Sequence, residues 1–412
     1  MEKPRVLLSA YACEPDRGSE PGVGWGWAHS LARHVDVTVI TRANNRTKIE
    51  AWNAGQKEET GIQFLYYDPH GWLLWLKKRR LPVNLFYLAW QWGMRRMILK
   101  RQDEFDIIHH LTFNSMMLPG LWWKTRVPVV LGPLGGTSRI RKDYKSLFGR
   151  FLLKEQLREM LIVTWNWLPW IRKSFNHAEL VLCANSQTLA MIGKSYEAKT
   201  RLMLEAGIRE DTLGNARDQS EDAEVRIVWI GTIEPWKAPA LAIKGFAKAV
   251  EKLGDRVSCV MDIVGEGRQK DLSMKLVKDL GLEEKIVFHG WVTKDEAQRM
   301  IRDSSVLLFS SVKDTSGNVV LEAMAQGVPV ICLNHQGVAD ITTEETAIRI
   351  EPGTIEETEK GIACAIVTLA RDPALRKKMG EAGLKRIREK YIWNKKAEKV
   401  AKWYRDLSDA TE

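Results

Sequence analysis

The segment 314–331 combines residue types that could hold a phosphorylated ligand. It has the pattern of a loop, a helix over about residues 317–326 and a Gly-Val-Pro turn into another apolar run. Backbone N–H groups at a helix start can bind a phosphate, and the helix dipole favours its charge. Glu322 lies one to two turns into this helix, within reach of a ribose held there, and Asp314 can accept hydrogen bonds from sugar hydroxyls. The residues at the helix start are Ser316, Gly317, Asn318 and Val319.

Residue type alone leaves a structural interpretation open, in which Asp314 only caps the helix and Glu322 is a surface carboxylate. The wider pattern favours binding. Asp314, seven intervening residues, Glu322 and then Ala-Met-Ala-Gln-Gly-Val-Pro-Val resemble the hallmark of family 4 of the retaining glycosyltransferases. In that family a Glu at the first position contacts the donor sugar, and a Glu at the second binds the nucleotide ribose. The resemblance implies these roles for Asp314, which is one methylene shorter than Glu, and for Glu322.

A second segment, residues 230–238, resembles the family's Gly-Arg-Leu-x-x-x-Lys-Gly loop. The family's Arg and Lys grip the donor diphosphate. Lys237 stands at the Lys position, and a flexible ammonium suits a diphosphate, although a loop lysine in solvent would look the same. Thr232 stands at the Arg position, so one cationic contact is missing or comes from elsewhere.

The runs 262–267 and 286–292 resemble the family's Gly-x-Gly and Phe-x-Gly elements. By that resemblance, the base of the nucleotide lies against the backbone after Gly290, at Trp291 and Val292. Without this context, a Gly-x-Gly pair is weak evidence and is more often a simple turn.

In the N-terminal half, Gly22 and Gly24 follow the first apolar run, where glycines let the backbone approach a ligand at a helix start. No Gly-Lys-Ser/Thr follows, so this is not a P-loop, and Trp27 stands where the third glycine of a dinucleotide fingerprint belongs. The segment resembles the family's first Gly-Gly loop, which faces the diphosphate and the acceptor.

His109 and His110 end another apolar run. The family commonly shows Asp-x-x-His-x-His there, with the outer histidine contacting the donor sugar or the acceptor. Because side chains alternate along a strand, we expect one of the two histidines to face a cleft and the other the sheet interior. A core histidine that is hydrogen-bonded for structural reasons remains the alternative.

Two series of short apolar runs must position these residues. Helix-like segments separate the runs, and strands alternating with helices predict doubly wound parallel sheets. The first series is Val6–Ala10, Val35–Thr41, Phe64–Tyr67, Phe105–His109, Val127–Leu131 and Glu179–Cys183. The second is Val225–Ile230, Cys259–Val264, Ile286–His289, Val306–Ser310 and Val328–Cys332, with helices expected over 239–253, 268–280, 294–303 and 317–326.

The polar, acidic stretch 209–224 separates the two series. We therefore expect an α/β protein with two Rossmann-like domains facing a cleft, which is the GT-B architecture that the resemblance also implies. The N-terminal, acceptor-side domain would span 1–208 and the donor-nucleotide domain 225–390. The last segment, 391–412, is expected to form a helix that packs back toward the N-terminal domain.

Bulk properties limit the class of protein. The 412 residues exceed what one core usually organises, and the five dispersed cysteines argue against a disulfide framework and suit a reducing cytoplasm. We expect no signal peptide and no membrane span. Residues 71–160 hold 17 Lys and Arg against 6 Asp and Glu, and 12 of the 17 tryptophans stand at or before Trp170. The segments 72–80 and 85–101 could therefore meet an anionic membrane, unless their aromatics pack inside and only the charges are exposed.

These observations predict transfer of a sugar from a nucleoside diphosphate sugar to a glycan or lipid-linked acceptor, in cell-surface polysaccharide synthesis, and the resemblance implies that the anomeric configuration is retained. Catalytic candidates are His109, His110, Lys237 and Asp314. No Asp-x-Asp pair occurs, so we expect no metal or other cofactor; nor is a nucleic-acid signature present. The expected location is the cytoplasm, where the protein could also contact the inner face of the membrane. The alternatives are a non-catalytic nucleotide- or membrane-binding homologue and a sugar-nucleotide 2-epimerase on the same fold.

Overall fold

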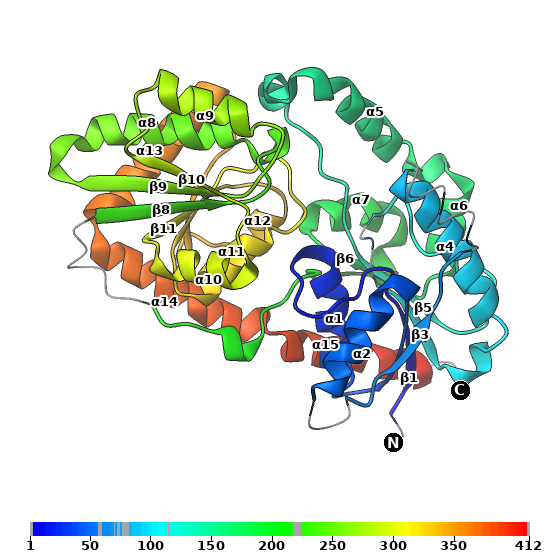
Figure 1. Cartoon of the computed structure of the whole chain (residues 1–412). Coiled ribbons are helices and arrows are strands. Elements are labelled where there is room, and N and C mark those ends of the chain that lie inside the picture. Colours follow the sequence, from blue (N-terminus) through cyan, green and yellow to red (C-terminus); the bar gives the residue numbers. More distant parts are fainter. Residues whose placement is uncertain are drawn as a thin grey trace. The chain divides into compact units, whose positions relative to one another are not determined.

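The computed structural model describes residues 3–56, 60–69, 71, 75, 82–111, 113, 115–216 and 224–409. The chain divides into two compact units, each with one parallel sheet (Figure 1). Unit 1 comprises Met1–Thr137, Met160–Gly207 and Trp393–Glu412. Unit 2 comprises Ser138–Glu159 and Ile208–Ile392.

The sheet of unit 1 has seven parallel strands in the order β3-β2-β1-β4-β5-β6-β7. The order reverses at β1 and β4, and the carboxyl ends of strands at such a switch point are where ligands usually bind. The strands are β1 (Arg5–Ser9), β2 (Asp36–Thr41), β3 (Gln63–Tyr66), β4 (Ile107–His110), β5 (Val129–Leu134), β6 (Leu180–Cys183) and β7 (Thr200–Leu202).

The sheet of unit 2 has six parallel strands in the order β10-β9-β8-β11-β12-β13, with its switch point between β8 and β11. These two strands carry the loops that contain Lys237 and Asp314. The strands are β8 (Glu224–Ile230), β9 (Ser258–Val264), β10 (Ile286–Gly290), β11 (Val306–Phe309), β12 (Val330–Leu333) and β13 (Ala347–Ile350).

Helices connect these strands. The α-helices of the first half are α1 (Ser19–Leu31), α2 (Arg46–Ala54), α4 (Val83–Ile98), α5 (Leu152–Val163), α6 (Pro169–His177) and α7 (Ser186–Tyr196). Those of the second half are α8 (Pro239–Leu253), α9 (Lys270–Asp279), α10 (Lys294–Asp303), α11 (Asn318–Ala325), α12 (Gln336–Ile341), α13 (Ile355–Arg371), α14 (Pro373–Lys390) and α15 (Trp393–Asp409). The 3-10 helices are η1 (Ala43–Asn45), η2 (Gln102–Glu104), η3 (Lys142–Phe151), η4 (Trp165–Trp167), η5 (Glu197–Lys199), η6 (Glu210–Thr212), η7 (Pro235–Lys237) and η8 (Gly254–Arg256).

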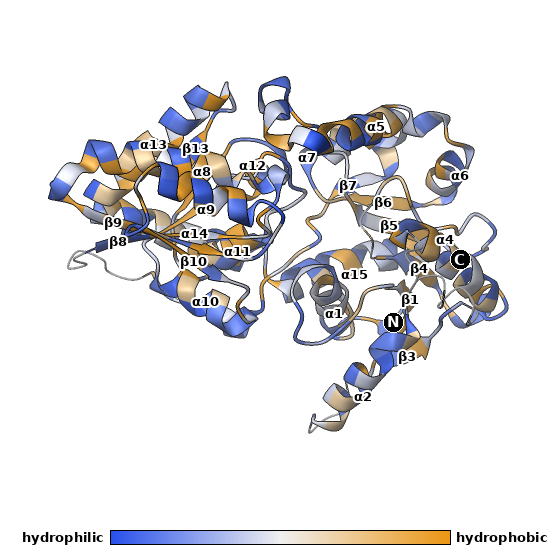
Figure 2. Ribbon diagram, turned by 45° about the horizontal axis from the view of Figure 1, so that its top comes forward, coloured by the Kyte–Doolittle hydropathy of each residue, from blue (hydrophilic) through white to orange (hydrophobic). Residues whose placement is uncertain are grey.

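In unit 2, α8, α9 and α13 cover one face of the sheet, and α10, α11 and α14 cover the other (Figure 1). A sheet covered on both faces needs strands that are apolar throughout, which explains the unbroken apolar runs of the sequence. The strands are accordingly coloured largely as hydrophobic, whereas the helices mix both colours (Figure 2).

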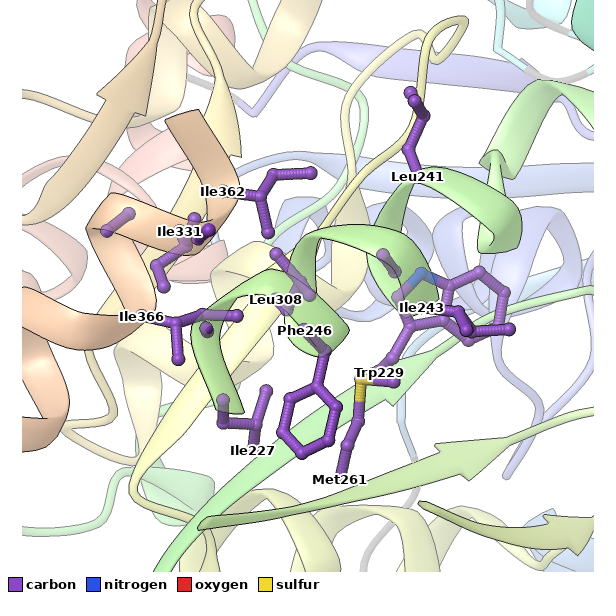
Figure 3. Packing of buried hydrophobic residues seen from close by; sticks show 14 of the residues in the cluster. Ile227, Trp229, Leu241, Ile243, Phe246, Met261, Leu308, Ile331, Ile362 and Ile366 are labelled. Carbon is purple, nitrogen blue, oxygen red and sulfur yellow. The ribbon is translucent and has the colours of Figure 1, made fainter. Parts of the chain in front are cut away.

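The core of unit 2 forms between the sheet and the pair α8 and α13. In Figure 3, Phe246 and Ile243 of α8 and Ile362 of α13 pack over Ile227 and Leu308 of the sheet, and all five are essentially inaccessible to solvent. Burying each such side chain contributes roughly 1.5–3 kcal/mol.

Residues 138–159 group with unit 2, although the sequence division placed them in the N-terminal domain. Ile140, Tyr144 and Phe148 insert into the core of unit 2, and the Tyr144 hydroxyl lies 2.8 Å from Thr358 Oγ1. These anchors stand four residues apart, as on one face of a helix, but that spacing does not tell which of the two cores the face packs against, so the sequence did not reveal that the segment belongs with unit 2.

Helix α15 belongs to unit 1, where it packs against α1. Trp393 fills the space that side chains at Gly26 and Gly207 would need, because a Cβ at either glycine would lie 2.5–2.6 Å from the indole ring. The Lys396 ammonium is buried beside it and donates to the carbonyls of Leu204, at 2.5 Å, and Ala206.

The prediction of two doubly wound parallel sheets is confirmed. All eleven expected strands are present within a few residues, whereas the short edge strands β7 and β13 were not predicted. Of the expected linker 209–224, residues 217–223 lie outside the described residues. No helix in the described ranges is long and apolar enough to cross a membrane.

Candidate functional site

Two loops meet at the switch point of unit 2. One leaves β8 at Ile230 and reaches Lys237 at the end of η7, and the other leaves β11 at Phe309 and leads into α11 at Asn318. The loops are joined by backbone hydrogen bonds, because the amide of Val312 donates to the carbonyl of Trp236 at 2.9 Å. The sheet topology thus brings together residues that lie about 77 positions apart in the sequence.

The Lys237 ammonium and the Asp314 carboxylate form an ion pair across the two loops. Both side chains are about one-fifth exposed, so the pair is accessible to a ligand. The other carboxylate oxygen of Asp314 accepts from the amides of Thr315, at 2.9 Å, and Gly317, at 3.3 Å. Burial alone would raise the pKa of Asp314, but Lys237 and these two amides hold that pKa below its usual value. Asp314 is therefore ionised at neutral pH and charge-balanced by Lys237.

Helix α11 begins directly beside this pair. Gly317 precedes the helix in a left-handed conformation (φ +66°), and a Cβ there would lie 2.8 Å from Val338 Cγ2, so glycine is required for both backbone and space. The first amides of a helix lack partners within it, and those of Asn318 and Val319 are placed to receive an anion. Ser316 is buried in the preceding turn.

Glu322 lies four residues into α11 and is mostly buried. Burial raises the pKa of its carboxyl to about 6, against the opposing charge of Lys294. A carboxylate with a raised pKa one turn from a helix start is not the solvated surface group that residue type alone allowed.

The glycine pair after β9 is a point of close backbone contact. A Cβ at Gly265 would lie 2.0 Å from the carbonyl oxygen of Gly231, and one at Gly267 would lie 2.3 Å from that of Ile233. The two glycines thus hold the loop after β8, which carries Thr232 and Lys237, against the end of β9. This is a stronger reason for the Gly-x-Gly pattern than a simple turn.

Three expected donor-binding residues of unit 2 are exposed to solvent at least in part. Trp291 is 76% exposed, Val292 is partly exposed and Thr232 is exposed. Arg268 is the cation next to the Thr232 loop, but its guanidinium pairs with Glu234 at 2.7 Å. The position that the family fills with Arg therefore has no direct cationic replacement among these neighbours.

The sequence did not single out the residues that support the Asp314 loop. The Asp314 amide donates to Gln336 Oε1 at 2.6 Å, and the Ser138 hydroxyl donates to the Asp314 carbonyl at 3.0 Å. Next to Asp314, the Lys313 ammonium lies 2.6 Å from Glu155 Oε2 of α5. Lys313 and Glu155 stand 158 residues apart and give no sequence signal, because only the fold brings them together.

In unit 1, the expected site residues surround the carboxyl ends of β1 and β4. Gly22 and Gly24 lie within α1 rather than in the loop before it, since that helix begins at Ser19. The Gly22 amide is among the first four of the helix, which lack helical partners. A Cβ at Gly22 would lie 2.1 Å from the carbonyl oxygen of Arg17, so the tight entry into the helix requires glycine there.

Both histidines of β4 are buried and fully hydrogen-bonded. His109 donates from Nε2 to the Gly132 carbonyl at 2.7 Å and accepts at Nδ1 from the Tyr404 hydroxyl at 2.5 Å. His110 bonds the Tyr87 hydroxyl at 2.7 Å and the Ser9 hydroxyl at 3.0 Å. Burial lowers the pKa of His109 to about 4 and that of His110 to about 3, so both rings are neutral at pH 7. For either ring to reach a substrate, one of these bonds must first break.

Only part of the two segments that were predicted to meet a membrane, 72–80 and 85–101, lies within the described residues. Of 72–80, only Trp75 lies within the described residues. In α4, which covers most of 85–101, the large residues Phe86, Tyr87 and Trp90 are buried, and Trp92 is 56% exposed. The alternative that these aromatics pack inside thus holds for most of α4. Among the residues described, no group of three or more His, Cys, Asp or Glu side chains could hold a metal ion.

Comparison with known proteins agrees with this geometry. Residues 215–386, which contain both loops and α11, match the family described as glycosyl transferases group 1. This match and relatives named as glycosyltransferases confirm the resemblance seen in the motifs of unit 2. The alignments with four curated relatives span only 40% to 50% of those proteins' lengths.

Two relatives and one solved structure illustrate the range. The lipopolysaccharide core biosynthesis glycosyltransferase LpsE of Rhizobium meliloti is 30% identical over 34% of this chain and 40% of that protein. The D-inositol 3-phosphate glycosyltransferase of Corynebacterium glutamicum is 22% identical over 92% of this chain and 89% of its own length. The Anabaena protein Alr3699/HepE in complex with UDP has a TM-score of 0.64 at 14% identity, covering 98% of this chain and all of that one. These structural matches establish the GT-B fold.

Proposed function

We propose that this protein transfers a sugar from a nucleoside diphosphate sugar to an acceptor, with the donor bound at the β8–β11 switch point of unit 2. The observation that carries the proposal is the Lys237–Asp314 pair at the start of α11, with Glu322 one turn further along. A cation and the first amides of a helix suit a diphosphate, and a carboxylate one turn further along suits the hydroxyls of a ribose. Alr3699/HepE, which shares the fold, was crystallised with UDP.

The reaction breaks the bond between the sugar C1 and the diphosphate oxygen and forms a bond from C1 to an acceptor hydroxyl. The diphosphate leaves with the electron pair of the broken bond, and the acceptor hydroxyl gives its proton to the departing diphosphate oxygen. Lys237 and the amides of Asn318 and Val319 would stabilise the charge that builds on the diphosphate. An ammonium has three donors, so Lys237 can keep Asp314 while it binds a phosphate oxygen.

Asp314 would accept hydrogen bonds from hydroxyls of the donor sugar, and Glu322 would hold the ribose. We propose that the anomeric configuration is retained, as in the family 4 enzymes that the motif resembles. We also propose that His109 or His110 contacts the donor sugar or the acceptor. For this, the hydrogen bond to Tyr404 or to Tyr87 would have to be exchanged for one to substrate. No step requires a metal ion or another cofactor.

The experiment is donor turnover by the wild type and by Glu322→Ala, monitored by release of the nucleoside diphosphate and by mass analysis of the sugar product. Transfer to acceptor by the wild type and its loss in the variant support the proposal. Nucleotide binding without any turnover would instead identify a non-catalytic homologue. A donor whose sugar is inverted at C2 would identify a sugar-nucleotide 2-epimerase.

We further propose that the acceptor is a glycan or a lipid-linked glycan, used in cell-surface polysaccharide synthesis. Support comes from relatives such as LpsE, named for lipopolysaccharide core biosynthesis. A hexose is the expected transferred group.

Such an acceptor would favour contact with the inner face of a membrane, and the described surface of unit 1 that suits this best is not α4 but residues 160–173, which comprise the end of α5, η4 and the start of α6. Its exposed large residues include Trp167 (84% exposed), and the charged residues of 160–173 that are exposed are all basic. Exposed tryptophan beside cations suits an anionic lipid interface. The apolar members are Met160, Leu161, Val163, Trp167 and Trp170, and the exposed cations are Arg172 and Lys173.

Co-sedimentation with vesicles tests this surface. The wild type should pellet with anionic but not with neutral vesicles at low salt, and the double change Arg172→Glu with Lys173→Glu should weaken binding. Lys194→Glu, an exposed charge reversal on α7, is the matched control. Equal pelleting of both variants would exclude α6 from the contact, and no pelleting of the wild type would exclude membrane binding.

A further inference from the structure

Residues of unit 2 on either side of the Asp314 loop form a closed ring of hydrogen bonds. Glu155 of α5 accepts from Lys313 at 2.6 Å and, with the same oxygen, from Arg158 at 2.8 Å. Arg158 donates in turn to the carbonyl of Ser138 at 2.6 Å, and the Ser138 hydroxyl donates to the carbonyl of Asp314 at 3.0 Å. Because Lys313 and Asp314 are adjacent in the chain, the ring closes on the loop itself.

The ring is largely shielded from solvent, so the electrostatic interactions among its charged groups are less screened than at the surface. The side chains of Lys313 and Glu155 are 19% and 14% exposed. Burial alone would raise the pKa of Glu155, but Lys313 and Arg158 hold it below its usual value. Glu155 is therefore an ionised group between two cations, and its removal would leave both of them partly buried without their shared partner.

The ring fixes the main chain on both sides of the Asp314 carboxylate. On one side it holds the Lys313 side chain, and on the other the Asp314 carbonyl, so the carboxylate itself points to Lys237. Asp314 is one methylene shorter than the Glu of the motif that it resembles, so the reach of its carboxylate depends more on where the main chain lies. A displacement of about 1 Å in a group that contacts substrate can lower the rate by roughly a hundredfold.

We propose that Glu155 is a positioning residue for sugar transfer, which sets the place of the Asp314 carboxylate through Lys313, Arg158 and Ser138. Glu155 itself touches neither donor nor acceptor. The proposal rests on the proposed function in one respect, namely that Asp314 contacts the donor sugar. It assigns a catalytic consequence to the segment 138–159, which the group 1 family match at 215–386 does not include.

The test compares Glu155→Gln with Glu159→Gln, a matched control on the same helix. Glu159 is also partly buried and accepts a backbone hydrogen bond, from Ile140 at 2.6 Å, and it acts on Lys313 through its charge but is not a member of the hydrogen-bonded ring, so the control separates the ring from the mere charge. The first measurement is hydrogen exchange of the ligand-free protein. Glu155→Gln should speed exchange in a peptide covering 312–318 on the order of tenfold, with α9 unchanged, and Glu159→Gln should leave the 312–318 peptide unchanged.

The second measurement separates positioning from a general loss of structure. Glu155→Gln should lower kcat with the donor on the order of tenfold and leave the Kd of UDP within about twofold, because Glu322 is outside the ring. Lys313→Met should give the same split, and the double variant should be no worse than either single one, since both break one interaction. Lys313→Met also keeps the test decisive if Glu155→Gln fails to fold.

Three results would overturn the proposal: unchanged exchange in 312–318, faster exchange with normal kcat, or an equal effect of Glu159→Gln. A wild type that binds UDP but turns over no donor would overturn the proposed function instead. In that case, the exchange data still decide whether Glu155 orders the loop.

Discussion

Glu322 gives the donor site a defined pH dependence. The pKa of its carboxyl is raised to about 6 by burial, and the ionised form is the one that accepts hydrogen bonds from two ribose hydroxyls. At pH 7, about ten molecules carry ionised Glu322 for each protonated one, and at pH 5 the ratio is reversed. If only the ionised form binds well, the affinity for a nucleotide sugar should fall about tenfold between pH 7 and pH 5. The neutral ring nitrogens of His109 and His110 do not titrate in this interval.

The assay is calorimetric titration with a nucleoside diphosphate sugar, whose diphosphate is a diester and keeps its charge over this range. Free UDP is unsuitable because its terminal phosphate titrates near pH 6. Glu322→Gln should bind more weakly at pH 7, by about 1.5–3 kcal/mol, and should show no decline toward pH 5. A wild-type affinity that is constant from pH 7 to pH 5, or a slope that persists in Glu322→Gln, would refute the assignment.

The same shift affects the stability of the ligand-free protein. Because the folded-state pKa is raised, the contribution of Glu322 is fully present below its unfolded pKa and is lost as the pH rises through about 6. The loss amounts to about 2 kcal/mol at pH 8. Glu322→Gln should therefore melt higher than the wild type at pH 8 and close to it at pH 4.5. If Glu322→Gln melts lower than the wild type at pH 8, contacts within the ligand-free protein must stabilise the ionised carboxylate.

Three further substitutions test other parts of the site and fold. Lys237→Met should lower kcat/KM with the donor on the order of a hundredfold while nucleoside affinity changes little, because the cation meets charge that grows in the transition state. The measurement is steady-state kinetics, and equal activity of variant and wild type would mean that the diphosphate is bound elsewhere. Asp314→Glu restores the residue of the motif and should alter the preference among sugars on one nucleotide, which a competition assay measures; an unchanged profile would mean that the side chain does not touch the sugar. Phe148→Ala should destabilise unit 2 by about 3–5 kcal/mol, seen as an earlier denaturant midpoint for the Trp229 region, whereas loss confined to unit 1 would contradict its place in this core.

The sequence predicted the parts of the fold that repeat a strong local pattern. Apolar runs such as 259–264 and 306–310 are buried strands because helices cover both faces of their sheet. The edge strands β7, Thr200–Leu202, and β13, Ala347–Ile350, are short and only partly buried, so they carry no such run.

The motif around 314–331 predicted which residues gather at the end of β11, and the topology places Lys237 beside them. The support of that loop was beyond sequence reasoning, because Glu155 and Ser138 are separated from Lys313 and Asp314 by more than 150 residues. The anchoring of 138–159 in unit 2 was missed for a related reason: Ile140, Tyr144 and Phe148 recur every four residues, as on a helix face, but such a period does not tell which of two cores the face packs against. Composition was also misleading in α4, where most of the aromatics that suggested a membrane surface fill the core of unit 1.

The central claim is that unit 2 binds a nucleoside diphosphate sugar through Lys237 and Glu322. The most direct measurement is thermal shift of the wild type, Lys237→Met and Glu322→Ala against a panel of UDP-, GDP- and ADP-sugars. A donor that binds only the folded state adds about 2.7 kcal/mol to the free energy of unfolding at a concentration a hundred times its Kd, and this raises the melting temperature. The account predicts that at least one donor stabilises the wild type, that Glu322→Ala loses most of this shift, and that Lys237→Met, whose cation acts mainly in the transition state, loses a smaller part of it. No shift with any donor, or an equal shift in Glu322→Ala, would contradict it.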